Sequence, residues 1–142
     1  MSVNMIAFEV RGVPAPQGSA RGFVADGKVH ITSANRGLAV WRRLVSDVAQ
    51  QYAPTSLWED PLAVTLTFRV PKPKSAPKKV RMWPARRPDL DKLCRACLDG
   101  LTGIVWRDDS QVVRLEAEKD YGAPGVIVWV ERVTQEDEEA EA

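Results

Sequence analysis

The sequence predicts a small, single-domain α+β protein in which a mixed β-sheet carries two main helices packed on one of its faces. Three observations support this class. The chain has 142 residues, of which 44% are hydrophobic, so it can form one core but has no room for a second domain. Strand-like segments outnumber helical ones, and several of them follow one another as sequential hairpins.

The first elements are a strand and a hairpin. Residues 5–11 alternate loosely between polar and apolar side chains, which indicates a strand. Two prolines and a glycine in residues 13–19 then indicate a loop. Residues 23–25 and 28–31 contain β-branched side chains and flank Asp26-Gly27, a dipeptide that suits a tight turn, so they predict a β-hairpin.

The next segment predicts a helix followed by a strand. Thr32 or Ser33 can cap a helix that ends before Pro54, and its apolar residues follow the spacing of one buried stripe: Leu38, Trp41, Leu44, Val45, Val48 and Tyr52. In residues 62–70 apolar side chains occupy every second position, which is the period of a half-buried strand. Pro71 ends this strand.

A basic loop and a second helix come next. Residues 71–88 contain five prolines and seven basic side chains, too many prolines for a helix and too much charge for a core, so they predict a mobile basic loop. Asp89 is a good N-cap for a helix that continues to about Thr102, and Gly103 is placed to end it. The apolar stripe of this helix consists of Leu90, Leu93, Cys97 and Leu101.

Two strands and an acidic tail complete the chain. Residues 112–121 and 126–133 predict strands joined by Gly122-Ala123-Pro124-Gly125. Residues 1–130 therefore form the folded domain. Residues 131–142 contain the end of the last strand and a tail that we expect to be disordered, because the segment holds six acids and one base. The tail either keeps the protein soluble or competes with nucleic acid for a basic surface.

The sequence carries no signal for export or membrane insertion. Its longest apolar run, residues 126–130, is far shorter than the roughly 20 residues of a membrane-spanning helix. The N-terminus lacks the basic segment, apolar core and cleavage site of a signal peptide. We therefore expect a cytoplasmic protein with no membrane contact, in which Cys94 and Cys97 remain thiols.

The net charge of +1 conceals an uneven distribution of charge. Without residues 131–142 it rises to +6, since 19 bases and 13 acids remain. Ten of the 20 basic residues lie between Arg69 and Arg95, where Asp89 and Asp91 are the only acids. This pattern is typical of a surface that binds a polyanion such as nucleic acid, but a solvated face produces the same pattern.

Two acidic pairs are candidate metal ligands. Asp89 and Asp91 have a spacing that points both side chains the same way in an extended segment, and Asp108 and Asp109 form the second pair. Carboxylate oxygens suit Mg²⁺, and a neighbouring basic loop could hold a phosphodiester beside the ion. The structural alternatives are that the first pair caps a helix and the second pair forms an ordinary turn.

Arg95 lies four residues from both Asp91 and Asp99, so the three side chains share one face of the expected helix. They can form a salt-bridge ladder, or Arg95 can stabilise the charge that develops on a scissile phosphate. Both roles are compatible with this spacing.

Other residue types offer less for catalysis. Cys94 and Cys97 form a CxxC, but the chain has no second such pair and His30 is its single histidine, so a four-ligand zinc site or a histidine-based hydrolase has little support. Trp41 and Trp129 lie in periodic elements and are expected to pack. Trp83 lies in the basic loop and is the best candidate to stack on a base.

Acidic, basic and glycine residues recur in three longer segments: Arg87-Pro88-Asp89-Leu90-Asp91-Lys92-Leu93, Leu98-Asp99-Gly100-Leu101-Thr102-Gly103 and Trp106-Arg107-Asp108-Asp109-Ser110-Gln111-Val112. Together these segments resemble the RusA family of phage and bacterial Holliday-junction resolvases. The resemblance continues through Lys119-Asp120-Tyr121-Gly122 and back to Gly12-Val13-Pro14-Ala15-Pro16-Gln17-Gly18. It covers most of the chain except the acidic tail, which makes residues 1–130 a RusA-like endonuclease domain.

The resemblance implies an Mg²⁺-dependent endonuclease, active as a homodimer, that resolves four-way DNA junctions by paired symmetric nicks in recombination and repair. It implies Mn²⁺ as an alternative ion and no small-molecule cofactor. By position, Asp89, Asp91 and Asp109 would be the essential metal-binding carboxylates and Asp108 an accessory one.

Two positions depart from the family pattern, which often has a lysine at Arg95 and an asparagine at Lys92. An arginine keeps the charge but cannot readily exchange a proton, so the role implied for Arg95 is electrostatic. The residues implied to contact DNA phosphates are Lys72, Lys74, Lys78, Lys79, Arg81, Arg86 and Arg87, with Arg21 and Lys119 as further candidates.

Other functions stay open from the residues alone. One is a metal nuclease with broader branched-DNA or RNA substrates. Another is a non-catalytic nucleic-acid-binding dimer, whose aspartates only cap a helix and balance the basic loop. A structural protein whose acidic tail regulates association comes last, and it predicts no salt-dependent affinity for DNA.

Overall fold

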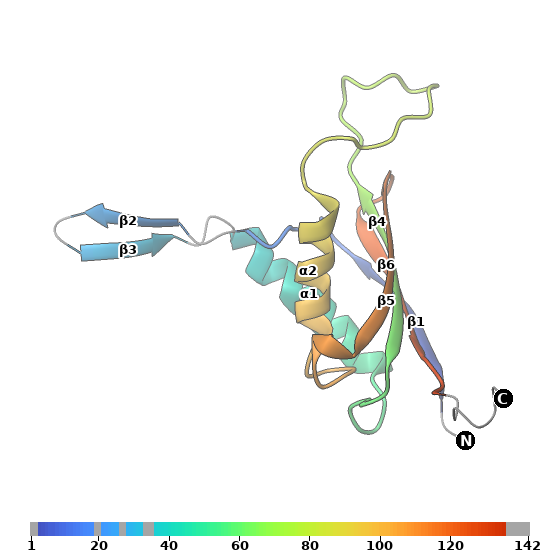
Figure 1. Ribbon diagram of the computed structural model, residues 1–142. Helices are drawn as coiled ribbons and strands as arrows, with labels where there is room; N and C mark the ends of the chain where they lie inside the picture. The colour runs from blue at the N-terminus through green and yellow to red at the C-terminus, as the bar shows by residue number, and fades with distance from the viewer. Residues whose placement is uncertain (1–2, 19–20, 26–27, 33–35, 136–142) are drawn as a thin grey trace.

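The computed structural model describes residues 3–18, 21–25, 28–32 and 36–135. Figure 1 shows two helices on one side of a β-sheet, with a separate hairpin extending away from them. In chain order the elements are β1 (Met5–Arg11), β2 (Arg21–Ala25), β3 (Lys28–Thr32), α1 (Arg36–Tyr52), β4 (Leu62–Val70), α2 (Leu90–Leu101), the 3₁₀ helix η1 (Asp109–Gln111), β5 (Val112–Tyr121) and β6 (Gly125–Arg132).

The main sheet has four strands in the order β1-β6-β4-β5. β6 runs antiparallel to both of its neighbours, whereas β4 and β5 run parallel, so the sheet is mixed as predicted. β2 and β3 pair only with each other in an antiparallel hairpin, which confirms that prediction. The turn residues 26–27 and the expected cap Ser33 lie outside the described residues.

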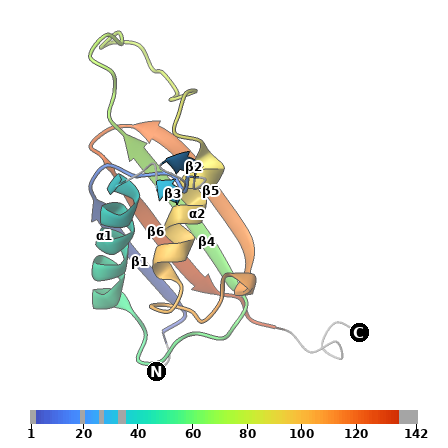
Figure 2. The same ribbon diagram turned by 90° about the vertical axis from the view of Figure 1, so that its left-hand side faces the viewer.

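Both helices cover the same face of the main sheet (Figure 2), and the hydrophobic core lies between them and the strands. β4 shows the predicted alternation. Its odd-numbered residues point outward, and its even-numbered residues are buried: Leu62, Val64, Leu66, Phe68 and Val70. From the helices, Trp41 and Leu93 are among the buried side chains. Alternating apolar residues thus gave the correct face of the sheet. The predicted α+β class is confirmed.

Trp129 is not a packing residue in this chain, although its position in a periodic element suggested that role. Its neighbours in β6, Val128 and Val130, point into the core, so Trp129 lies on the opposite face of the sheet and is 44% exposed. Period-two alternation alone does not say which of two apolar sets is buried.

The last two strands do not form the hairpin that their short connection suggested. β5 and β6 lie on either side of β4, so the connection crosses the end of that strand. Gly122 begins the crossing, and its N–H donates to the carbonyl of Val70 at 3.0 Å. The strands to be joined are about 10 Å apart, two strand spacings, which three extended residues can span. No local sequence pattern predicts that β4 lies between β5 and β6, which follow one another in the chain.

α1 and α2 approach closely at Gly100. Ser46 Oγ donates to the carbonyl of Gly100 at 2.8 Å, and a Cβ atom on this residue would lie 3.1 Å from Val45 Cγ1. Arg42 and Asp99 form an ion pair at 3.1 Å across the same contact. The orientation of α2, which carries the candidate site, is therefore set by its packing on α1.

The two ends of α2 are where the sequence placed them. Asp89 occupies the N-cap position, and Gly103 follows the C-cap residue Thr102 with a φ of 82°, a left-handed conformation that favours glycine. The Asp89 side chain makes no capping hydrogen bond. No helix in the described part of the chain is long and apolar enough to cross a membrane.

Candidate active site

Asp89 and Asp91 lie at the N-terminal end of α2, directly after the basic loop. Both side chains are exposed. Asp89 Oδ2 lies 3.8 Å from Lys92 Nζ, an ion pair one turn along the helix. Since Asp89 caps no backbone N–H, the capping role that could have explained its presence is not realised. Its carboxylate oxygens remain available to a cation.

Asp91 borders a hollow of about 310 Å³ together with Lys92, Arg95, Gln17 and Gly18. The loop that follows β1 forms the other wall, and it is held in place because the Gln17 N–H donates to the carbonyl of Lys92 at 3.0 Å. Gln17 Oε1 is buried and has no hydrogen-bond partner among the described residues. A buried acceptor without a partner is unusual and marks a place where a ligand or water can donate a hydrogen bond.

Gln17 was not selected as a site residue from the sequence. The available signal was the resemblance at Gly12–Gly18, which placed this loop within the family pattern without giving Gln17 a role. Only the folded chain brings the loop beside α2.

The salt-bridge ladder, one of the two roles that the spacing along α2 allows, does not form. Asp99 pairs with Arg42 of α1 at 3.1 Å, and Arg95 makes no ion pair with Asp91 or Asp99 in the described structure. The helical spacing was correct, but a partner from the neighbouring helix lies closer to Asp99. Arg95 is exposed at the edge of the hollow, where its guanidinium can face a bound anion.

The second acidic pair lies beyond the other end of α2. Asp108 caps η1, where its Oδ1 accepts a hydrogen bond from the N–H of Ser110 at 2.9 Å. Gln111 Oε1 closes the capping box by accepting from the N–H of Asp108 at 2.8 Å. The hydrogen bonds from Ser110 lower the pKa of the Asp108 carboxyl below its ordinary value. The structural alternative, an ordinary turn, therefore describes Asp108 well.

Asp109 is half-buried beside the end of the helix. Its Oδ1 accepts a hydrogen bond from Trp106 Nε1 at 3.0 Å and another from the hydroxyl of Thr102. Trp106 is fully buried, so this carboxylate is oriented by the core of the domain. One Asp109 oxygen is used in these contacts, which leaves the other free to bind a ligand.

The two acidic pairs are separated by the length of α2. The helix has 12 residues, which corresponds to about 18 Å between its ends. Among the described residues, no three histidine, cysteine or acidic side chains gather closely enough to hold one metal ion. The second pair therefore does not border the basic loop of its own chain, because α2 runs away from the loop before that pair begins.

Several cations in the basic loop and beside it are used within the chain. Lys72 Nζ donates to the carbonyl of Pro77 at 2.8 Å. Arg81 makes two hydrogen bonds of 2.9 Å to Asp120 of β5. Lys119 Nζ donates to the carbonyls of Arg86 and Pro88, each at 2.8 Å. The segment has no helix or strand, as predicted, but these contacts tie it to the edge of the sheet.

The Arg81–Asp120 pair also affects a titration. The hydrogen bonds from Arg81 lower the pKa of the Asp120 carboxyl below its ordinary value, aided by the N–H of Tyr121 and the charges of Arg81 and Arg69. Asp120 is therefore ionised at neutral pH and holds Arg81 in place.

Five other loop residues have exposed cationic side chains that make no hydrogen bond or ion pair to another described residue: Lys74, Lys78, Lys79, Arg86 and Arg87. They are the candidates best placed to contact phosphates. Arg21 lies in β2, and its side chain is outside the described structure.

The two cysteines are buried free thiols in α2. Burial, and then the charge of Asp91, raises the pKa of Cys94 from its ordinary value of 9.0 to about 11. Burial also raises the pKa of Cys97 strongly. Both groups are therefore protonated at neutral pH and are packing residues rather than nucleophiles.

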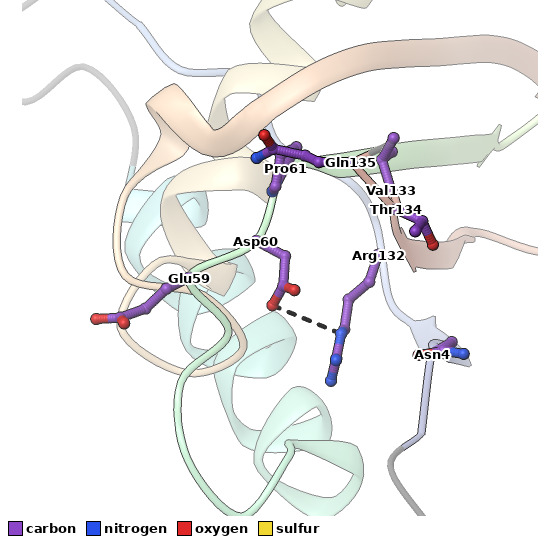
Figure 3. Close-up of a pocket in the computed structure, with 8 residues that line it drawn as sticks. All are labelled: Asn4, Glu59, Asp60, Pro61, Arg132, Val133, Thr134 and Gln135. Carbon is purple, nitrogen blue, oxygen red and sulfur yellow. Dashed lines mark ion pairs between the residues drawn. The ribbon is translucent and has the colours of Figure 1, made fainter. Parts of the chain in front are cut away.

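A larger hollow of about 480 Å³ lies at the opposite end of the sheet from the basic loop. Figure 3 shows Arg132 pointing toward Asp60, with which it forms an ion pair at 3.5 Å. Glu59, which also lines this hollow, pairs with Arg107 at 2.8 Å. These carboxylates are paired more closely than Asp89 is with Lys92 at 3.8 Å, and Asp91 has no ion pair among the described residues, so this hollow offers a cation less than Asp89 and Asp91 do.

Comparison with known proteins places these features in a family. The model of the family described as Endodeoxyribonuclease RusA matches residues 12–131. The chain is also 30% identical to the Bacillus subtilis (strain 168) protein named Uncharacterized protein YqaN, over 93% of this chain and 99% of that protein. The matched residues include α2, both acidic pairs and the whole basic loop.

Proposed function

This chain belongs to the RusA family of endodeoxyribonucleases, and we propose that it cleaves four-way DNA junctions by Mg²⁺-dependent hydrolysis of paired phosphodiesters. The observation that carries the proposal is the position of Asp89 and Asp91. These exposed carboxylates begin α2, directly beside Arg95 and below a loop whose free cations can hold a phosphate backbone.

The donor atoms at this position fit a hard cation. Asp89 and Asp91 provide carboxylate oxygens that make no hydrogen bond to the described part of the chain, and Mg²⁺ is usually bound by one or two carboxylates while it keeps several waters. A bound ion would supply Lewis-acid polarisation of the scissile phosphodiester. Mn²⁺ prefers similar oxygen ligands and would serve as an alternative ion.

The basic side chains beside these carboxylates would position the substrate. Arg95 would donate hydrogen bonds to a non-bridging phosphate oxygen and oppose the negative charge that increases there during attack. Lys92, already paired with Asp89, would keep that carboxylate oriented. Neither proton transfer nor general-base chemistry is assigned to Arg95, because a guanidinium stays protonated.

A homodimer would explain why the two acidic pairs lie at opposite ends of α2. In a two-fold dimer, each contact is made twice with the partners exchanged. If two α2 helices lie antiparallel across the axis, Asp109 of one copy reaches Asp89 and Asp91 of the other, and two equivalent sites form. Two sites related by a two-fold axis suit the two related strands of a four-way junction.

The free cations of the loop would bind the arms of the junction through phosphates. Such contacts hold DNA without reading its sequence, and they make the affinity strongly dependent on salt. Lys74, Lys78 and Lys79 lie along the outer part of the loop, whereas Arg86 and Arg87 lie next to Asp89. The last two would therefore contact phosphates nearest the point of cleavage.

The test is cleavage of an immobile four-way junction beside a linear duplex of matched sequence, with Mg²⁺ or with EDTA. We expect the wild type to make paired nicks in the junction alone and only with the metal. Asp91→Asn, with a wild-type circular dichroism spectrum, should bind the junction without cutting it. Equal cleavage of flaps, forks or RNA would favour a broader metal nuclease.

One observation favours a different function, a non-catalytic DNA-binding dimer. Asp108 and Asp109 both make hydrogen bonds within their own chain, so the second pair has a structural role that needs no metal. Under this alternative, well-folded wild type would bind junctions but leave them intact with Mg²⁺ and with Mn²⁺.

A further inference from the structure

Trp83 is an exposed tryptophan in the basic loop, and its ring is supported from one side. The side chain is 56% exposed, whereas Trp41, Trp58 and Trp106 are buried in the core. The guanidinium carbon of Arg81 lies 4.3 Å from the centroid of the Trp83 ring, within the range of a cation–π contact. From this geometry we propose that Trp83 is a stacking platform for an unpaired nucleobase of the branched DNA substrate. The proposal rests on the proposed function.

The guanidinium under the ring is itself held by an ion pair to the sheet. Arg81 makes two parallel hydrogen bonds of 2.9 Å to the carboxylate of Asp120, the arrangement that fixes a guanidinium most firmly. Asp120 belongs to β5 and also accepts from the N–H of Tyr121 at 2.8 Å. The indole is therefore connected to the sheet through two planar groups. A platform fixed in advance loses little conformational entropy when a base stacks on it.

The backbone around the ring is held as well. The N–H of Ala85 donates to the carbonyl of Trp83 at 2.8 Å, and Pro84 is buried. Lys119 fixes the next part of the loop through the carbonyls of Arg86 and Pro88. Trp83 thus keeps a defined position a few residues before Asp89, on the segment that leads into the candidate active site.

The surroundings favour a nucleobase over a protein side chain as the occupant. The exposed cations of the same loop, including Lys79 and Arg86, would bind the phosphates attached to the base. A hollow of about 190 Å³ next to Arg81 is lined by Val80, Met82, Tyr121, Gly122 and Lys72, a mixture of apolar surface and hydrogen-bonding groups. Aromatic rings beside a basic groove are the usual means of holding single-stranded bases.

The other exposed tryptophan, Trp129, lacks these features. It lies on the open face of the sheet, and its partners in the neighbouring strands are Ala7 and Thr65. No cation–π contact to Trp129 is found in the described residues. Trp83 therefore differs from Trp129 in the guanidinium that supports its ring and in the basic loop around it, not in exposure alone.

The test combines a protein change with a DNA change. Dissociation constants are measured in EDTA for a junction with unpaired thymines at its crossover and for the same junction with abasic sites there, which keeps every phosphate. For the wild type and for Trp83→Phe, removal of the bases should weaken binding about 5- to 150-fold, the range that one base–aromatic stack supplies. For Trp83→Leu, the two junctions should bind equally.

Three outcomes separate the proposals. If the wild type does not cut the junction with Mg²⁺, the proposed function fails. If it binds the junction but Trp83→Leu loses as much affinity on removal of the bases as the wild type, the platform is refuted. The salt dependence of binding shows whether Trp83→Leu has displaced the loop cations. If it has, Trp83→Phe is compared on the two junctions instead. In that case, a loss of affinity below 2-fold on removal of the bases overturns the proposal.

Discussion

Asp91 and Asp109 lie at opposite ends of helix α2. Asp91 is in the first turn of the helix, whereas Asp109 follows its C-terminal end and accepts a hydrogen bond from Trp106. About 17 Å of helix separates Asp91 from Thr102, the other partner of Asp109. One metal ion cannot be held by both carboxylates of one chain at that distance. Any site that uses both must be shared between two chains.

A shared site predicts that two inactive variants restore each other. Asp91→Asn and Asp109→Asn should each abolish junction cleavage, but after co-refolding the mixed dimers should regain it. Each mixed dimer has one site with both aspartates intact, so about a quarter of the wild-type sites return in a 1:1 mixture. Nicking of a labelled junction measures this, and the mixed dimer should leave singly nicked products.

The contrary result is also clear. If each site lay within one chain, every site in the mixture would carry one defect, and mixing would restore nothing. Asparagine keeps the oxygen that accepts from Trp106, so Asp109→Asn should fold normally, which its thermal melting curve checks.

A second prediction separates the acids that line the site from one that does not. Asp89→Asn and Asp91→Asn should each reduce the cleavage rate at least about 100-fold, because loss of a metal-binding carboxylate removes several kcal/mol of electrostatic stabilisation. Asp99→Asn on the same helix is the matched control, since Asp99 pairs with Arg42. We expect it to cut at a rate within about 3-fold of the wild type, at a stability cost of about 1 kcal/mol or less.

The fold was predictable where the signal is local. The alternation in residues 62–70 and the stripe from Leu90 to Leu101 each belong to one element, and both elements begin and end within a residue or two of their predicted bounds. The insertion of β4 between β5 and β6 depends on contacts between distant segments, which no local pattern encodes.

The candidate site shows the same limit. Helical spacing placed Asp91 and Arg95 on one face, and both border the same hollow. Spacing could not show that Asp99 would form its ion pair with Arg42, 57 residues away in the chain, and not with Arg95. Closeness in sequence likewise suggested that Asp109 lies near the basic loop, but the helix between them carries it to the far end of the domain.

A third prediction concerns the contact between the helices. Gly100→Ala gains about 1 kcal/mol of helix propensity but places a methyl group 3.1 Å from Val45 Cγ1, and such overpacking costs about 1–3 kcal/mol. We expect a net loss of about 1 kcal/mol in the free energy of unfolding, measured with urea. In a Val45→Ala background the Cγ1 contact is removed, but the Cβ atom of residue 45 at 3.3 Å and the Arg42 carbonyl oxygen at 3.4 Å remain, so the same change should destabilise less than it does in the wild type. Equal effects in both backgrounds would contradict the close contact.

The buried thiols predict a loss of stability in alkali. The pKa of Cys94 rises from 9.0 in the unfolded chain to about 11 in the folded one, and that of Cys97 rises in the same direction. The folded state therefore holds protons that the unfolded state releases, so the stabilisation is complete below about pH 9 and is lost as the pH rises toward 11. Each thiol should contribute about 1 kcal/mol to the loss by pH 10.

Urea unfolding at pH 8 and pH 10 measures this loss. Tyrosine and lysine titrate in the same range, so the comparison is with a Cys94→Ala/Cys97→Ala variant. Its free energy of unfolding should fall less between the two pH values than that of the wild type. An identical fall in both proteins would show that the thiols ionise as freely in the folded chain as in the unfolded one.

The last prediction distinguishes the loop lysines by what they already bind. Lys79 is exposed with no partner among the described residues, whereas Lys72 Nζ donates to the carbonyls of Pro77 and Val80 at 2.8 and 3.5 Å. A lysine that contacts a phosphate releases a counterion, which adds about 0.9 to the slope of log affinity against log salt. Lys79→Gln should therefore lower that slope for junction binding in EDTA by about 1, and Lys72→Gln should leave it nearly unchanged. If both variants lower the slope equally, Lys72 leaves its internal contacts when the loop binds DNA, because in the free protein its ammonium is directed at carbonyls of its own chain.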